Sequence, residues 1–82
     1  SNMKISEQDL KKIISKALNV KLNKITDDLN SNKMEEWDSL GQLSIISSLD
    51  KKYKGKIDLS KIAAMYSYKE IKSFLKKKLA MK

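Results

Sequence analysis

The sequence contains no cysteine, histidine, proline or arginine, and it has only two glycines. Without cysteine it cannot form a disulfide framework or a thiolate metal site. Without a thiol or an imidazole it has few groups for nucleophilic or acid–base catalysis. No apolar run approaches the roughly 20 residues of a membrane-spanning helix. We therefore expect a cytoplasmic protein that is not an enzyme and has no metal site and no membrane span.

The length of 82 residues fits one small domain, which leaves little room for a deep active site. Ser1 and Asn2 precede Met3 and resemble the remnant of an expression tag. We expect a single domain over residues 3–82.

The formal net charge is +8 at pH 7, yet lysine supplies all 18 basic residues. Because arginine is the preferred reader of guanine edges, its absence argues against a nucleic-acid partner. The charge is also uneven. Residues 27–38 carry five acids against one lysine, whereas residues 51–82 carry eleven lysines against two acids. The middle of the chain is an acidic region of a basic protein, and it could steer a positively charged partner.

The spacing of apolar residues predicts helices and no strands. The first helix is expected to start at Ser6, which forms a capping box with Asp9. The second begins at Asp38 or Ser39 and ends soon after Tyr53. Its predicted buried stripe is Leu40, Leu43, Ile46, Leu49 and Tyr53, widened by Ile45.

A short third helix is expected from Leu59, Ile62, Ala63 and Tyr66, and Gly55 marks the turn before it. The pair Ser67 and Glu70 caps a last helix with the core face Ile71, Phe74, Leu75 and Leu79. Residues 19–38 lack a sustained period, which predicts a long loop pinned to the helices by spaced apolar side chains: Val20, Leu22, Ile25, Leu29 and Met34. The predicted fold is all-α: a small four-helix bundle with three main helices, one short helix and a long first loop.

The run EEWDSLGQL at residues 35–43 places Ser39 where the acidic loop gives way to the second helix. With a serine at the start of its second helix and three further helical segments in about eighty residues, the chain resembles the acyl carrier protein family. The resemblance covers the chain after Met3 and is strongest over residues 37–53. The Trp-Asp-Ser-Leu-Gly form is similar to discrete, specialised carriers more than to the housekeeping carrier of fatty-acid synthesis.

The resemblance implies that Ser39 receives a 4′-phosphopantetheine arm from coenzyme A, added by a separate phosphopantetheinyl transferase. The arm would hold an acyl or aminoacyl group as a thioester. The implied partners are this transferase, an acyl- or aminoacyl-loading ligase, and acyl-using transferases or synthases. The carrier is expected to be a monomer.

Residues near Ser39 are candidates for recognition by these partners: Trp37, Asp38, Leu40, Gly41, Gln42 and Ser44. Leu40 is either a partly exposed apolar contact or ordinary core. Trp37 either braces the loop or touches the partner. Gly41 either permits close approach of the arm or a partner, or is merely tolerated on an exposed turn. Housekeeping carriers place acids along this helix, whereas this face is mostly neutral, which favours a dedicated set of partners.

Six apolar residues near the junction of the second and third helices could enclose an acyl chain, or could be simple core: Ile45, Ile46, Leu49, Ile62, Ala63 and Tyr68. Three rival functions remain. A basic nucleic-acid module would use Lys69, Lys72, Lys76, Lys77 and Lys78. A protein-interaction bundle, or a degenerate carrier that has lost its modification, would use Ser39 only as a helix cap. An enzyme would need Glu35 or Asp38 as a base, with no activated nucleophile nearby.

Overall fold

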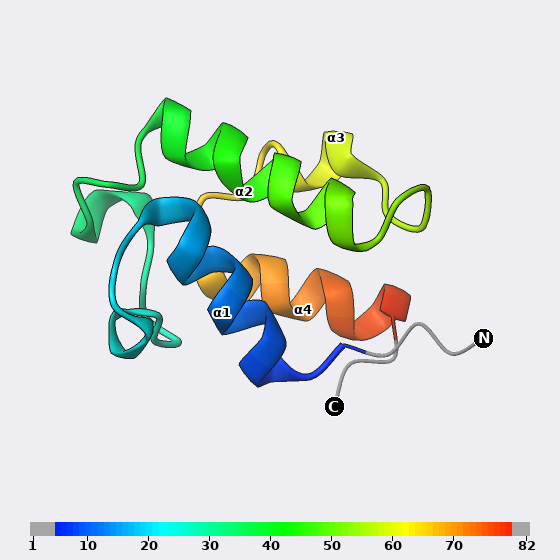
Figure 1. The fold of residues 1–82 in the computed structure, drawn as a ribbon, viewed down its shortest axis with the longest axis horizontal. Coiled ribbons are helices and arrows are strands. Elements are labelled where there is room, and N and C mark those ends of the chain that lie inside the picture. Colours follow the sequence, from blue (N-terminus) through cyan, green and yellow to red (C-terminus); the bar gives the residue numbers. More distant parts are fainter. Residues whose placement is uncertain (1–4, 80–82) are drawn as a thin grey trace.

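Four α-helices and two short 3-10 helices make up the regular structure of residues 5–79 (Figure 1). The computed structural model describes the backbone of residues 5–79 and the side chains of residues 5–77, so the expected tag remnant lies outside it. The elements are α1 (Glu7–Leu18), η1 (Leu22–Lys24), η2 (Ser31–Lys33), α2 (Ser39–Lys52), α3 (Leu59–Ile62) and α4 (Tyr68–Leu79). No strand occurs between residues 5 and 79, and the predicted all-α bundle is confirmed.

The predicted capping residues start the first and last helices. Ser6 Oγ accepts a hydrogen bond from the Asp9 amide at 3.0 Å. Before α4, Ser67 Oγ accepts from the Glu70 amide at 3.2 Å and donates to the Glu70 carboxylate at 3.0 Å. These bonds satisfy amides that have no partner inside the helix, which explains why both helices begin where the sequence indicates.

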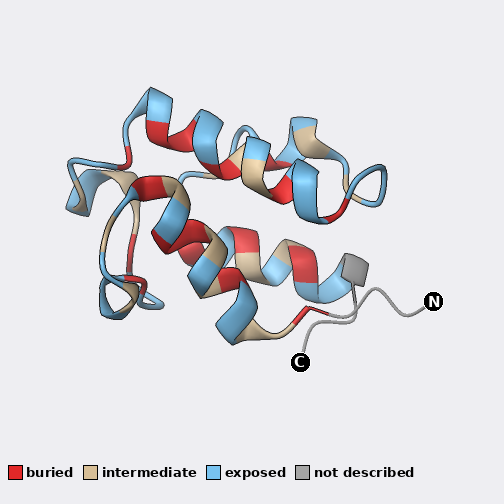
Figure 2. Cartoon of the chain, in the orientation of Figure 1, coloured by how far each residue is buried: buried red, intermediate tan, exposed pale blue. Residues whose placement is uncertain are grey.

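The core forms where the buried faces of α1, α2 and α4 meet, as the red segments of Figure 2 show. Leu10 and Ile14 of α1, Ile45 of α2, and Ile71 and Leu75 of α4 are all 0% exposed. Phe74 is partly buried against this core, and the side chain of Leu79 lies outside the described residues.

The long loop between α1 and α2 is fastened at several points. Ile25 and Leu29 are buried in the core, as predicted for apolar pins. The backbone adds a bridge between Asn30 and Ser67. The Ser31 amide donates to the Tyr66 carbonyl at 2.9 Å, and the Tyr68 amide donates to the Leu29 carbonyl at 3.0 Å. The loop is thereby tied to the connection between α3 and α4.

The predicted buried stripe of α2 is wrong over its first two turns. Leu40 and Leu43 are 73% and 61% exposed, and Ile46 is only partly buried. The buried positions of the helix are instead Gly41, Gln42, Ile45 and Leu49. The apolar periodicity predicted the wrong face because Gln42 and Gly41 occupy inward positions of the helix. A pattern of apolar residues does not detect a buried polar residue or a buried glycine.

Candidate functional site around Ser39

Ser39 is the first residue of α2 and is exposed. Its neighbour Asp38 is the N-cap: Asp38 Oδ1 accepts from the Gly41 amide at 2.8 Å, and the Asp38 carbonyl accepts from the Gln42 amide at 2.9 Å. Ser39 is therefore not the helix cap that the protein-interaction alternative assigned to it, because Asp38 fills that role. The Ser39 side chain is presented to solvent without a capping duty.

The surface beside Ser39 is apolar, although α2 begins in an acidic region. Leu40 and Leu43 are two of only three large hydrophobic side chains that are exposed among the described residues. They line an open groove of about 610 Å³ between α1 and α2, which Lys16, Ala17 and Ser44 also line. Of the two interpretations of Leu40, ordinary core is excluded.

Three predicted recognition residues lie inside the protein. Trp37 and Gln42 are 1% and 3% exposed, and Gly41 is also buried. Trp37 braces the loop and is not a surface for a partner. Asp38, Leu40 and Ser44 are exposed and keep their candidate role.

Gly41 has a structural role that neither sequence interpretation foresaw. A Cβ atom added at Gly41 would lie 2.8 Å from Leu18 Cδ2 and would also collide with the backbone carbonyl oxygen of Glu36. Only a residue without a side chain lets the loop backbone approach the first turn of α2 this closely. Gly41 thus fixes how the chain enters the Ser39 turn.

The proposed acyl-chain residues do not form one cavity-lining set. Ile45, Leu49, Ile62 and Tyr68 are 0% exposed and belong to the packed core. Ala63 is the C-cap residue of α3 and is exposed, so its assignment to a cavity is wrong. Ile46 is partly buried at the edge of the core.

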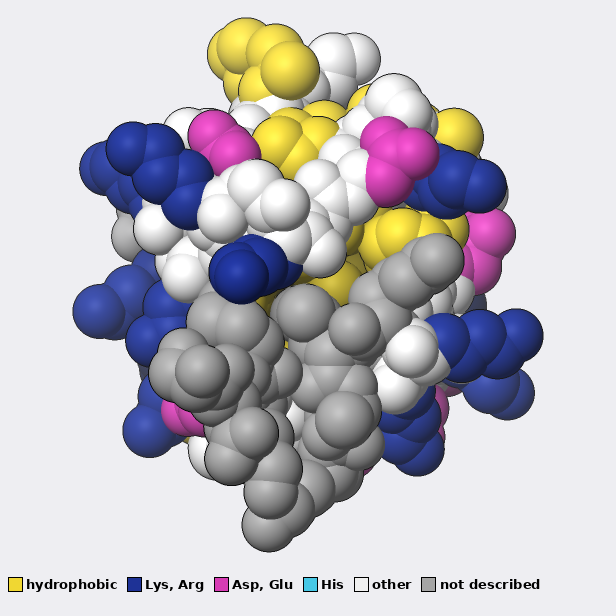
Figure 3. Space-filling view, turned by 90° about the vertical axis from the view of Figure 1, so that its right-hand side faces the viewer, with side chains coloured by type: hydrophobic (Ala, Val, Ile, Leu, Met, Phe, Trp, Pro, Cys, Tyr) yellow, Lys and Arg dark blue, Asp and Glu magenta, His cyan; other side chains and the backbone are white. Residues whose placement is uncertain are grey.

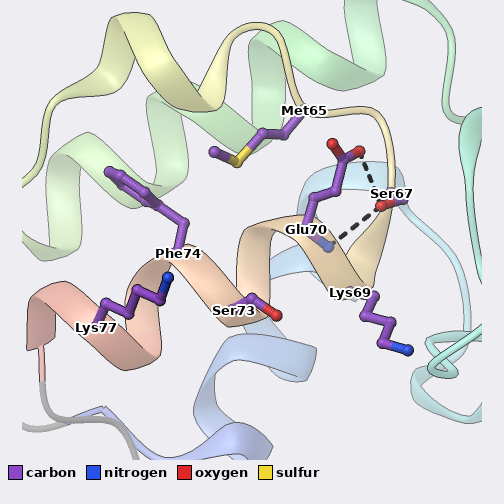
Figure 4. A pocket seen from close by; sticks show the side chains of 7 residues that line it. All are labelled: Met65, Ser67, Lys69, Glu70, Ser73, Phe74 and Lys77. Carbon is purple, nitrogen blue, oxygen red and sulfur yellow. Dashed lines mark hydrogen bonds between the residues drawn. The ribbon is translucent and has the colours of Figure 1, made fainter.

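A cleft that the sequence did not reveal lies between the α3–α4 connection and α4 (Figure 4). It has a volume of about 440 Å³. Met65 and Phe74 point toward one another across it, and the capping pair Ser67 and Glu70 borders it. Met65 lies in an irregular connection, so no periodic pattern could have indicated its position.

The lysine-rich surface is partly engaged within the protein. Lysine side chains (dark blue) lie around the rim of the face seen in Figure 3. Lys72, which the nucleic-acid alternative requires, contacts Glu7 at 3.2 Å and Asp27 at 2.6 Å. These carboxylates raise the pKa of Lys72, chiefly through the hydrogen bond to Asp27. Lys72 is therefore not a free cation for phosphate binding, and the side chain of Lys78 lies outside the described residues.

Between residues 5 and 79, no helix is both long and apolar enough to cross a membrane. The same part of the chain has no group of three or more acidic, histidine or cysteine side chains that could hold a metal ion. Comparison with protein-family models, curated proteins and solved structures found no match to this chain.

Proposed function

We propose that this protein is a carrier, which holds an acyl or aminoacyl group as a thioester on a 4′-phosphopantetheine arm attached to Ser39. The observation that carries the proposal is the placement of Ser39. It is exposed at the first position of the 14-residue helix α2, next to a cap supplied by Asp38 and beside the exposed Leu40. The resemblance of residues 37–53 to acyl carrier proteins supports the same reading.

The residues around Ser39 fit the phosphate of such an arm. The first amides of a helix have no intrahelical partner and lie at the positive end of its dipole, which favours an anion. One Asp38 carboxylate oxygen is committed to the Gly41 amide. The backbone amides of Ser39 and Leu40 come before Gly41, whose amide binds the Asp38 side chain. They are therefore placed to donate hydrogen bonds to a phosphodiester. The arm supplies a thiol, and the chain itself has none.

The surface near Ser39 suits enzymes that must hold the carrier briefly. Leu40 and Leu43 offer apolar contact, and Ser44 continues the neutral face of α2. Glu35, Glu36 and Asp38 are exposed on the approach to the helix and would attract a basic partner surface. We propose a transferase with its own Mg²⁺, a loading ligase, and acyl-using transferases or synthases as partners of a monomeric, cytoplasmic carrier.

The test is the intact mass of the protein after incubation with coenzyme A, Mg²⁺ and a broad-specificity phosphopantetheinyl transferase. We expect one phosphopantetheine adduct on the wild type and on Ser47→Ala, which removes an exposed serine of α2 that is not a recognition candidate. We expect no adduct on Ser39→Ala. An adduct on Ser39→Ala, or none on folded wild type with several transferases, would overturn the proposal.

A further inference from the structure

The buried side chain of Gln42 uses all of its hydrogen-bonding groups within the protein. Gln42 Oε1 accepts from Trp37 Nε1 at 2.7 Å. Gln42 Nε2 donates to the carbonyl oxygens of Met65 at 2.8 Å and Ile62 at 2.9 Å, with Ala63 at 3.3 Å. An amide has two N–H donors and one acceptor oxygen, so both ends of this one are occupied.

The two ends of the amide hold segments that are distant in sequence. Trp37 precedes Ser39 by two residues and is 1% exposed, so its indole fixes the loop that enters α2. Residues 62–65 are the end of α3 and the start of the connection to α4. A four-residue helix leaves its last carbonyls without intrahelical donors. The Gln42 amide donates to the Ile62 carbonyl, which also accepts from the Met65 amide, and to the carbonyls of Ala63 and Met65 just after the helix. Met65 in turn borders the cleft of Figure 4.

Simple packing does not account for an amide at this position. A buried apolar residue of similar size would take the acceptor from the indole N–H and the Gln42 donor from the Met65 carbonyl, which is costly, although the Ile62 carbonyl would keep its bond from the Met65 amide at 2.9 Å. A buried carboxylate could accept from Trp37 but, when ionised, could not donate to the carbonyls. An ammonium group could donate but not accept. The amide satisfies both sides at once, so the chemistry of Gln42 matches a link between the two segments.

We propose that Gln42 is a positioning residue for Ser39. It joins the loop before Ser39 to the end of α3, so the presentation of Ser39 depends on the conformation of the α3–α4 connection. This inference rests on the proposed carrier function for its consequence at Ser39. The link itself is a property of the folded chain and is tested separately.

The link is tested by hydrogen exchange in a cycle of two substitutions. Trp37→Phe removes the indole donor, and Gln42→Met removes the amide at similar volume. Trp37 is the only tryptophan, so its indole N–H gives a single resonance. We expect Gln42→Met to speed exchange of this indole N–H and of the Met65 amide about tenfold. We expect Trp37→Phe to speed exchange of the Met65 amide in wild type, and to add nothing in the Gln42→Met background.

The matched control is Ile71→Val, which loosens the core at a residue of α4 that is 0% exposed. We expect Ile71→Val to speed exchange of the Met65 amide no more than it speeds exchange of the most protected amides. Equal effects of Trp37→Phe in both backgrounds would overturn the link. If Gln42→Met does not fold, Trp37→Phe alone decides, because unchanged exchange at Met65 contradicts a link through the amide.

The consequence for Ser39 is tested by the kinetics of phosphopantetheine transfer. We expect Gln42→Met to raise KM for the carrier about tenfold, with kcat less affected, and Ile71→Val to change neither. Unchanged constants for folded Gln42→Met would overturn the positioning role. A wild type that accepts no arm would refute the carrier function, and Gln42 would then have no role at Ser39. The exchange cycle distinguishes this result from a missing link.

Discussion

Tyr68 and Glu7, the first residues of α4 and α1, are joined by a hydrogen bond of 3.0 Å from the phenol to the carboxylate. Lys72 donates to the same carboxylate at 3.2 Å. It also reaches Asp27 in the long loop at 2.6 Å. These bonds, first that of Lys72 and then that of Tyr68, lower the pKa of Glu7 below its usual value of 4.5. Two helices and the loop are thus fastened by one group of polar side chains.

This cluster predicts a loss of stability in acid that depends on Glu7. Because the pKa of Glu7 is lower in the folded protein than in the unfolded chain, its stabilisation is complete above about pH 4.5 and is lost as the pH falls further. The free energy of unfolding, measured with urea between about pH 3 and pH 6, should fall less steeply for Glu7→Gln than for wild type. Parallel curves would contradict this role.

A second prediction compares the two glycines. Gly41→Ala should destabilise the protein by about 1–3 kcal/mol, because the new methyl group meets the Glu36 carbonyl and Leu18. Gly55→Ala should cost about 1 kcal/mol through its φ of +72° alone, since nothing lies near the added carbon. Only Gly41→Ala should also slow modification of Ser39, because it displaces the entry to α2. Equal modification rates for the two variants would argue against this.

The exposed leucines yield a third prediction, for binding and not for folding. Leu40→Ser and Leu43→Ser should change the free energy of unfolding by no more than about 0.5 kcal/mol, because both side chains are in solvent. Each should raise the KM of the transferase for the carrier, by about tenfold for the more important contact. Tyr66→Ser is the control: its side chain is 42% exposed on the α3–α4 connection. The prediction fails if all three variants are modified alike.

A fourth prediction concerns Tyr53, the C-cap residue of α2. Its hydroxyl is buried and has no hydrogen-bond partner in the described part of the protein. Burial, with a smaller contribution from Asp9, raises the pKa of Tyr53 to about 12. Tyr53→Phe removes a desolvated hydroxyl and should leave the free energy of unfolding unchanged or raise it by up to about 1 kcal/mol. A clear loss in thermal or urea unfolding would show that the hydroxyl has a partner.

Local signals were the part of the fold that the sequence predicted well. The capping serines Ser6 and Ser67, and the helix start at Asp38 and Ser39, depend on side chains that bond to amides within three residues. Such bonds are encoded by short spacing. The apolar pins Ile25 and Leu29 were also recognised, because large apolar residues in a polar loop must find a core.

Features that depend on distant contacts were missed. Nothing beside Gln42 in sequence indicates that its amide meets Trp37 and the end of α3, so a polar residue on α2 read as surface. Because the Gln42 face of α2 is buried, Leu40 and Leu43 lie on the exposed side of the helix. The close approach at Gly41 and the cleft at Met65 likewise arise only when separate segments meet.

The central claim is that Ser39 acquires an arm ending in a thiol, and a thiol titration tests it most directly. The chain has no cysteine, so the unmodified protein has no reactive thiol. After treatment with coenzyme A, Mg²⁺ and the transferase, and removal of free coenzyme A, we predict one thiol for each wild-type chain and none for Ser39→Ala. Equal thiol content in the two proteins would contradict the carrier function.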